Sequence, residues 1–85
     1  MTKEYFIEAT RYQGSGIRIL SRGLSMKSRK VVYVDGVEIG EYLNVSKARQ
    51  AAKFVIHGYR DLAWNFSIEG ITAIAKSRKP NARRT

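Results

Sequence analysis

The side chains that could support catalysis are few: the 85 residues include one histidine, no cysteine and seven Asp and Glu residues. General acid–base and nucleophilic catalysis need such groups brought together with tuned protonation states. His57 is alone beside an apolar helical stripe, where a structural role is commoner than a catalytic one, and a metal pair would need a second histidine. Gly14-Ser15-Gly16 lacks the third glycine and the lysine of a phosphate-binding loop, so we interpret it as a turn. We therefore expect a protein that is not an enzyme and has no cofactor and no metal site.

Basic side chains are the remaining chemistry, and their placement says more than their number. Sixteen Lys and Arg against seven acids give a formal net charge of +9. No acid occurs in residues 9–34 or 42–60, whereas Asp35, Glu38 and Glu41 are concentrated near one predicted turn. A surface that only keeps a protein soluble usually intersperses both signs. The segregation therefore favours a polyanionic partner.

Nucleic acid is the polyanion that this pattern favours most, with duplex DNA preferred and RNA as the less favoured substrate. The predicted contacts lie on strands, on a loop and in the C-terminal segment: Arg11, Arg18, Arg22, Lys27, Arg29, Lys30, Tyr33, Lys76, Arg78, Lys79, Arg83 and Arg84. Such a protein would be an accessory or regulatory one of the kind found in phages and mobile elements. The alternative is a small protein-binding inhibitor or adaptor, for example a phage-encoded inhibitor of a host nucleic-acid enzyme, that docks on an acidic protein surface.

A hairpin followed by a helix is the clearest pair of elements. Residues 31–34 are β-branched and aromatic, Asp35-Gly36 suits a type I′ turn, and residues 37–42 return as the next strand. Asn44 stands at a helix N-cap position. Apolar residues then recur at helical spacing to about Ala63: Ala48, Ala51, Ala52, Val55, Tyr59 and Leu62. The flank of this predicted helix is basic, with Lys47, Arg49, Lys53 and Arg60.

The other predicted elements are strands and turns. Residues 3–12 and 17–20 alternate as two strands around the turn at residues 13–16, and residues 21–28 form a surface loop. Residues 64–76 are predicted to be a last strand with a bulge at Gly70. We therefore expect an α+β fold in the order β-β-β-β-α-β, an antiparallel sheet of four or five strands with one helix packed on a face.

The chain is predicted to form one domain, residues 1–76, followed by a disordered basic tail, residues 77–85. The four apolar residues 31–34 predict a central strand covered on both faces, so a homodimer could form through the sheet face that the helix leaves open. No apolar run is long enough for a membrane span and no signal peptide is visible. We expect a soluble protein of the cytoplasm, either associated with the nucleoid or in the cytoplasm of a host, with no membrane partner.

The hairpin, its Ile39-Gly40-Glu41-Tyr42 end and the capped, alanine-rich helix resemble the three-stranded sheet-plus-helix DNA-binding domain of plant ethylene-response factors. They are also similar to the arm-binding N-terminal domain of tyrosine recombinases. In those families the sheet lies in the major groove and the helix packs behind it. By matching positions, the resemblance implies that Arg18, Arg29, Lys30 and Tyr33 face the DNA and that Ala48, Ala51, Ala52 and Val55 support the sheet. Small phage-encoded inhibitors of host enzymes show the same order of elements, so both functions stay open.

Overall fold

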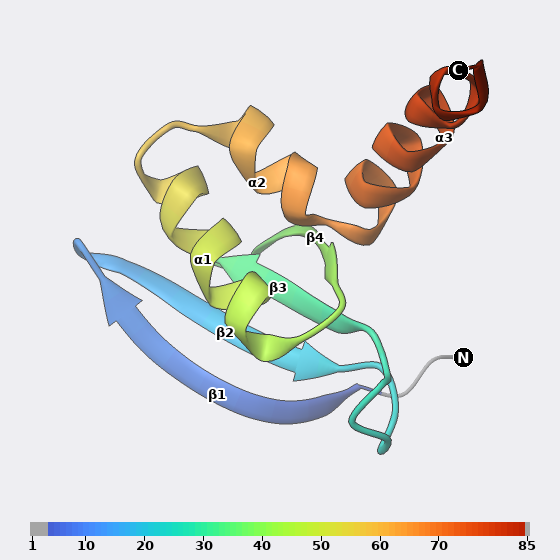
Figure 1. The fold of residues 1–85 in the computed structure, drawn as a ribbon. Coiled ribbons are helices and arrows are strands. Elements are labelled where there is room, and N and C mark those ends of the chain that lie inside the picture. The colour runs from blue at the N-terminus through green and yellow to red at the C-terminus, as the bar shows by residue number, and fades with distance from the viewer. Residues whose placement is uncertain (1–3, 85) are drawn as a thin grey trace.

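A sheet of four antiparallel strands is followed by three helices in the computed structural model, which describes the backbone of residues 4–84 and the side chains of residues 4–77. The elements are β1 Tyr5–Tyr12, β2 Ser15–Ser21, β3 Lys30–Val34, β4 Val37–Tyr42, α1 Val45–Ile56, α2 Arg60–Phe66 and α3 Ile68–Arg84. The strands pair in the order in which they occur in the chain. α1 crosses one face of the sheet, α2 packs beside α1, and α3 projects away from the body (Figure 1).

The predicted turns and helix cap are confirmed. Asp35 and Gly36 have φ angles of 52° and 85°, and Gln13 and Gly14 repeat this pair of positive values at the β1–β2 turn. Asn44 caps α1, because its side-chain oxygen accepts a hydrogen bond of 2.8 Å from the backbone N–H of Lys47. These local signals fix both hairpin registers and the start of the helix.

The core lies between α1 and the sheet face that it crosses. Ile17, Ile19, Val32 and Val34 from β2 and β3 are at most 9% exposed. They meet three helix residues that are fully buried, Ala48, Ala51 and Ala52. Alanines have short side chains, so the helix can lie close to the β-branched surface of the sheet.

Tyr42 packs at one end of this core and makes the stability of the fold depend on pH in the alkaline range. It is 1% exposed, and burial raises the pKa of its hydroxyl to about 12 from an ordinary value of 10.0. The folded pKa exceeds the unfolded one, so the stabilisation is complete below pH ~10 and is lost as the pH rises through about 12. The full loss lowers the free energy of unfolding by about 2.7 kcal/mol.

Tyr42→Phe should therefore flatten the fall in unfolding free energy between pH 9 and 12, as measured by urea denaturation at each pH. Lysine titration affects every variant equally, so the difference from the unsubstituted protein isolates Tyr42. Tyr59→Phe is the matched control, because Tyr59 is 57% exposed. An equal alkaline loss in the Tyr42→Phe protein would contradict the assignment.

The predicted continuation of the helix to Ala63 is wrong, because α1 ends at Ile56. Gly58 has a φ of 90°, and its N–H bonds the carbonyl of Val55 at 3.0 Å while the N–H of Tyr59 bonds that of Phe54 at 2.7 Å. This pair of bonds is a Schellman motif, which stops a helix at a left-handed glycine. Of the apolar positions beyond the stop, Ala63 of α2 is buried, whereas Tyr59 and Leu62 are exposed.

The predicted fifth strand is also wrong, as is the expectation of a single helix: residues 64–76 belong to α2 and α3. Ser67 separates the two helices, and its hydroxyl accepts from the N–H of Gly70 at 3.0 Å as a helix cap does. Gly70 is buried, and a Cβ there would lie 1.9 Å from the carbonyl oxygen of Trp64. The glycine that suggested a strand bulge is instead needed where two helices meet.

α3 continues to Arg84, through the segment for which the sequence predicts disorder. Its contacts with the rest of the chain are made with α2 and β4. Among the described residues, no helix combines the length and apolar character needed to cross a membrane. The division into a domain of residues 1–76 and a basic tail stays a prediction.

Candidate nucleic-acid interface

The sheet has a second face, here called the open face, that points away from α1. Residues that pair directly across neighbouring strands share a face. The register therefore places two rows on the open face: Phe6, Leu20, Val31 and Glu41, then Ala9, Arg18, Tyr33 and Glu38. This is the face that the resemblance assigns to DNA.

Acids and cations on the open face neutralise one another. Arg22 lies 2.6 Å from a carboxylate oxygen of Glu4, 2.6 Å from one of Glu41 and 3.5 Å from one of Glu38. We call this group the carboxylate cluster. Arg29 joins it through Glu41 at 3.3 Å. The hydrogen bond to Glu41, with the nearby charges of Glu4 and Glu38, raises the pKa of Arg22. The positive charge of Arg22 is therefore already balanced by acids of the same chain.

The carboxylate cluster also explains why residues 31–34 are apolar on both sides. Val31 is fully buried although α1 lies on the other face. Arg22 extends from the end of β2 to Glu38 and Glu41 on β4, and this path crosses β3. The aliphatic part of a long basic side chain can cover apolar surface in this way. Arg22 thus covers part of the open face from within the chain, and the homodimer stays a prediction.

Lys30 requires a correction as a predicted DNA contact. It is 5% exposed and lies in the row of Ser21 and Tyr42, on the side of the sheet that faces α1. Its ammonium group donates hydrogen bonds to the carbonyl oxygens of Met26 and Ser28. A buried cation must be hydrogen-bonded in this way, and it cannot also reach a phosphate.

The other predicted contacts fall into three groups. Arg11, Arg18, Lys27 and Lys76 are exposed, as is the partly paired Arg29. Tyr33 is half-buried, and burial, followed by the charges of Glu4 and Glu38, raises its pKa. The side chains of Arg78, Lys79, Arg83 and Arg84 lie outside the described residues.

A groove between β1 and α1, here called the basic groove, gathers uncompensated positive charge. Its volume is about 260 Å³, and it is lined by Glu8, Thr10, Arg11, Tyr12, Ile17, Arg49 and Lys53. Arg49 and Lys53 of α1 thus lie beside a single carboxylate. Arg11 borders the groove from β1, but it pairs with Gly16 and therefore shares the open face with Arg18. Arg49 donates two hydrogen bonds to Glu8, of 2.8 and 2.7 Å, and this bonding lowers the pKa of Glu8 and raises that of Arg49.

Aromatic contacts position the cations of the basic groove. The Lys53 ammonium lies 5.1 Å from the ring centroid of Tyr12, within cation–π range. The Tyr12 hydroxyl and His57 Nε2 are hydrogen-bonded at 2.8 Å, which ties β1 to the C-terminal end of α1. Lys47, which also belongs to α1, has its ammonium group 5.4 Å from the ring centroid of Phe66 in α2. The positive flank of α1 is therefore held in place.

Among the residues that line the basic groove, only Arg11 belongs to the predicted contact list. Arg49 and Lys53 were recognised as the basic flank of a helix and were not proposed as contacts. The acid-free run of residues 42–60 was the signal that could have found them. Their contacts with Glu8 and Tyr12 depend on the packing of α1 beside β1, which residue spacing does not reveal.

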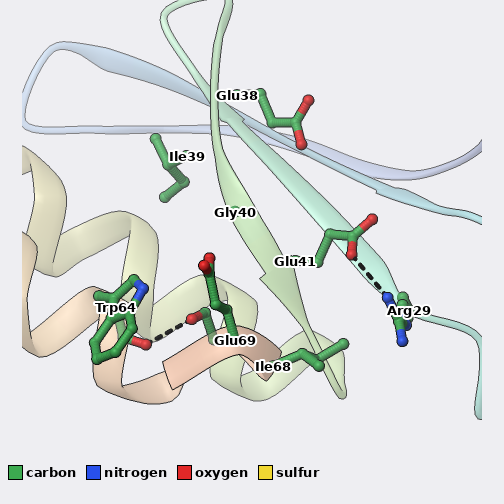
Figure 2. A pocket seen from close by; sticks show the side chains of 9 residues that line it. Arg29, Glu38, Ile39, Gly40, Glu41, Trp64, Ile68 and Glu69 are labelled. Atoms are coloured by element: carbon green, nitrogen blue, oxygen red, sulfur yellow. Dashed lines mark hydrogen bonds and ion pairs between the residues drawn. The ribbon is translucent and has the colours of Figure 1, made fainter. Parts of the chain in front are cut away.

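A second pocket, between β4 and the α2–α3 junction, has the opposite charge (Figure 2). It measures about 330 Å³ and is lined by Arg29, Glu38, Ile39, Gly40, Glu41, Trp64, Ser67, Ile68 and Glu69. Three carboxylates and one guanidinium make it unsuitable for phosphate. In the part of the chain that the structure describes, no group of three or more His, Cys, Asp and Glu residues is arranged to hold a metal ion.

Comparisons with protein-family models, with curated proteins and with solved structures found no match to this chain.

Proposed function

We propose that this chain is a small non-enzymatic nucleic-acid-binding protein that holds the phosphates of duplex DNA along β1 and α1. The observation that carries the proposal is a difference in pairing: most acids have a partner within the part of the chain that the structure describes, whereas several cations have none there. Most acids already accept from a partner in the described chain: Glu4, Glu8, Asp35, Glu38 and Glu41. Lys53 at the basic groove and Arg11 on the adjoining open face of β1 have no such carboxylate partner among the described residues.

This arrangement suits a phosphate backbone better than the open face does. On the open face Arg18 shares its row with Glu38, and Arg29 is paired with Glu41. In the basic groove the one acid, Glu8, is already held by Arg49. Cations that are not compensated within the chain release the counterions of DNA when they bind, and this release favours association. The basic residues 76–84 would add to the same effect.

Duplex binding measured over a salt series tests the proposal. If about five to seven phosphates are engaged, log affinity should fall against log salt with a slope of roughly −5 to −6. Fluorescence anisotropy of a labelled duplex between low and physiological salt measures this slope. A single-stranded RNA of equal length tests the preference for duplex DNA. A dissociation constant weaker than ~100 μM at low salt, or one indifferent to salt, would exclude this function, because phosphate contacts supply most non-specific affinity.

A protein partner is the second candidate, and the apolar surface of the helices favours it. Tyr59, Leu62, Trp64 and Ile74 are between 37% and 57% exposed. Tyr and Trp are enriched at the centres of protein interfaces, where their rings are buried in pockets of the partner. Affinity capture from a nuclease-treated lysate separates the candidates, since stoichiometric retention of one protein would favour the inhibitor or adaptor, and loss of all partners would favour nucleic acid.

A further inference from the structure

The β2–β3 loop displays two large apolar side chains to solvent. Leu24 is 83% exposed and Met26 is 90% exposed, more than any other large apolar residue described. Exposure of these groups does not stabilise the fold, because apolar side chains contribute to stability when they are removed from water. Neither the core nor the basic groove uses them.

This loop is ordered by its own hydrogen bonds. The backbone N–H of Arg22 bonds the carbonyl of Arg29 at 2.9 Å, and that of Ser28 bonds the carbonyl of Ser25 at 3.0 Å. The hydroxyl of Ser25 accepts from the N–H of Lys27 at 3.0 Å. The exposed side chains are therefore attached to a backbone whose polar groups are engaged, as a pre-organised contact element requires.

Lys30 supplies the strongest of these constraints. A buried ammonium group costs free energy unless it is fully hydrogen-bonded, so its carbonyl partners are held firmly. One of these partners is the carbonyl of Met26 itself, at 3.1 Å. The lysine thus fixes the backbone of the residue whose side chain is most exposed.

We propose that Leu24 and Met26 form a wedge that enters a base step of duplex DNA and bends it. This inference rests on the proposed function and extends it. Apolar side chains inserted between bases unstack the step and kink the duplex, while neighbouring cations hold the phosphates. The chain from Ser21 to Lys30 has no acid and carries Lys27 and Arg29 beside the wedge. The nearest acids, Glu4 and Glu41, are engaged by Arg22.

The position of the loop favours a rod-shaped partner over a flat anionic membrane. The loop and the β1–β2 turn lie at opposite ends of the sheet (Figure 1). The basic groove contains Arg11 and Tyr12, next to that turn. Seven residues of β2 separate the two ends, which is roughly 20 Å, or about six base pairs. A duplex lying along β1 reaches both sites, whereas a plane touching the loop tip leaves the basic groove behind.

The test compares Leu24→Ser/Met26→Ser with the unsubstituted protein on a duplex that carries end labels for energy transfer and an internal 2-aminopurine. The unsubstituted protein should raise energy transfer, for a bend of roughly 20–90°, and should raise 2-aminopurine fluorescence through unstacking. The double variant should lose both signals and keep its affinity within roughly tenfold, because phosphate contacts supply most of that affinity. Val37→Ser/Leu43→Ser removes two other exposed aliphatic side chains, 64% and 47% exposed, and should retain both signals.

Each other outcome overturns the wedge in a distinct way. Salt-dependent binding by the unsubstituted protein without bending or unstacking would reject the wedge and leave the proposed function intact. Equal signals from the Leu24→Ser/Met26→Ser protein would assign bending to another part of the chain. If the protein binds no nucleic acid, both proposals fail. Co-sedimentation with phosphatidylserine vesicles that the double variant abolishes would then identify the loop as a membrane contact.

Discussion

Ala52→Asp is expected to unfold the domain at neutral pH. Ala52 is fully buried where α1 packs on the sheet. A carboxyl there must be neutral to remain buried, and protonating a group with a pKa of about 3.9 at pH 7 costs about 4 kcal/mol. The added volume in a close-packed site costs about 1–3 kcal/mol more. The sum approaches the whole stability of a domain of this size, which is about 4–13 kcal/mol.

Gln50→Asp is the matched control, because it places the same carboxylate on the exposed side of the same helix. Circular dichroism and thermal melting should show a folded protein with nearly unchanged stability for Gln50→Asp and a loss of the cooperative transition for Ala52→Asp. A folded Ala52→Asp protein with a cooperative melt would mean that α1 does not pack on the sheet through this residue.

Elements with a local chemical requirement could be predicted from the sequence. A type I′ turn needs two positive φ angles, and Asp35-Gly36 provides them. An N-cap needs a short side chain that accepts a hydrogen bond, and Asn44 provides it. Each of these signals acts within a few residues, so no knowledge of tertiary packing was needed to recognise it.

The fifth strand was predicted incorrectly because residues 64–76 satisfy two periods. Ile71, Ala73 and Ala75 alternate as in a strand, whereas Ala63, Ser67 and Gly70 recur at helical spacing and are buried at the α2–α3 junction. Ser67 beginning an Ile-Glu-Gly first turn is a helix-start signal. The decisive contact is the carbonyl of Trp64 against Gly70, which exists only once α2 and α3 have met.

The site was harder to predict than the fold, since basic residues look alike in a sequence. Arg18 lies in β2 and Arg22 directly follows this strand. Arg22 pairs with three carboxylates, whereas Arg18 is exposed. Lys30 is buried because its position in β3 places its side chain on the side of the sheet that faces α1. The sequence predicted a strand covered on both faces, but only for residues 31–34. Which cations remain available depends on where the acids fold, and that is a long-range property.

Two double substitutions with equal changes in net charge should distinguish the basic groove from the open face. Lys47→Gln/Lys53→Gln removes the two lysines of α1, one of them in the basic groove, that have no ion-pair partner among the described residues. Arg18→Gln/Arg29→Gln removes two cations that the resemblance assigns to the DNA-facing sheet. Counterion release makes each phosphate contact worth roughly tenfold in affinity near 0.1 M salt. The first variant should therefore bind duplex DNA roughly 10²-fold more weakly and lose about 1.8 from the salt slope. The second should lose less than roughly tenfold.

The two variants are also matched in what they cost the fold. Lys47 and Lys53 give up cation–π contacts with Phe66 and Tyr12, and Arg29 gives up an ion pair with Glu41, each worth about 0.5–1 kcal/mol or less at a surface. Thermal melts should therefore agree, and a difference in binding can be assigned to the surface. If the Arg18→Gln/Arg29→Gln protein loses as much affinity as the groove variant or more, the open face is the contact surface. The carboxylate cluster would then have to open for DNA to bind, because Arg29 and Arg22 hold Glu41 between them.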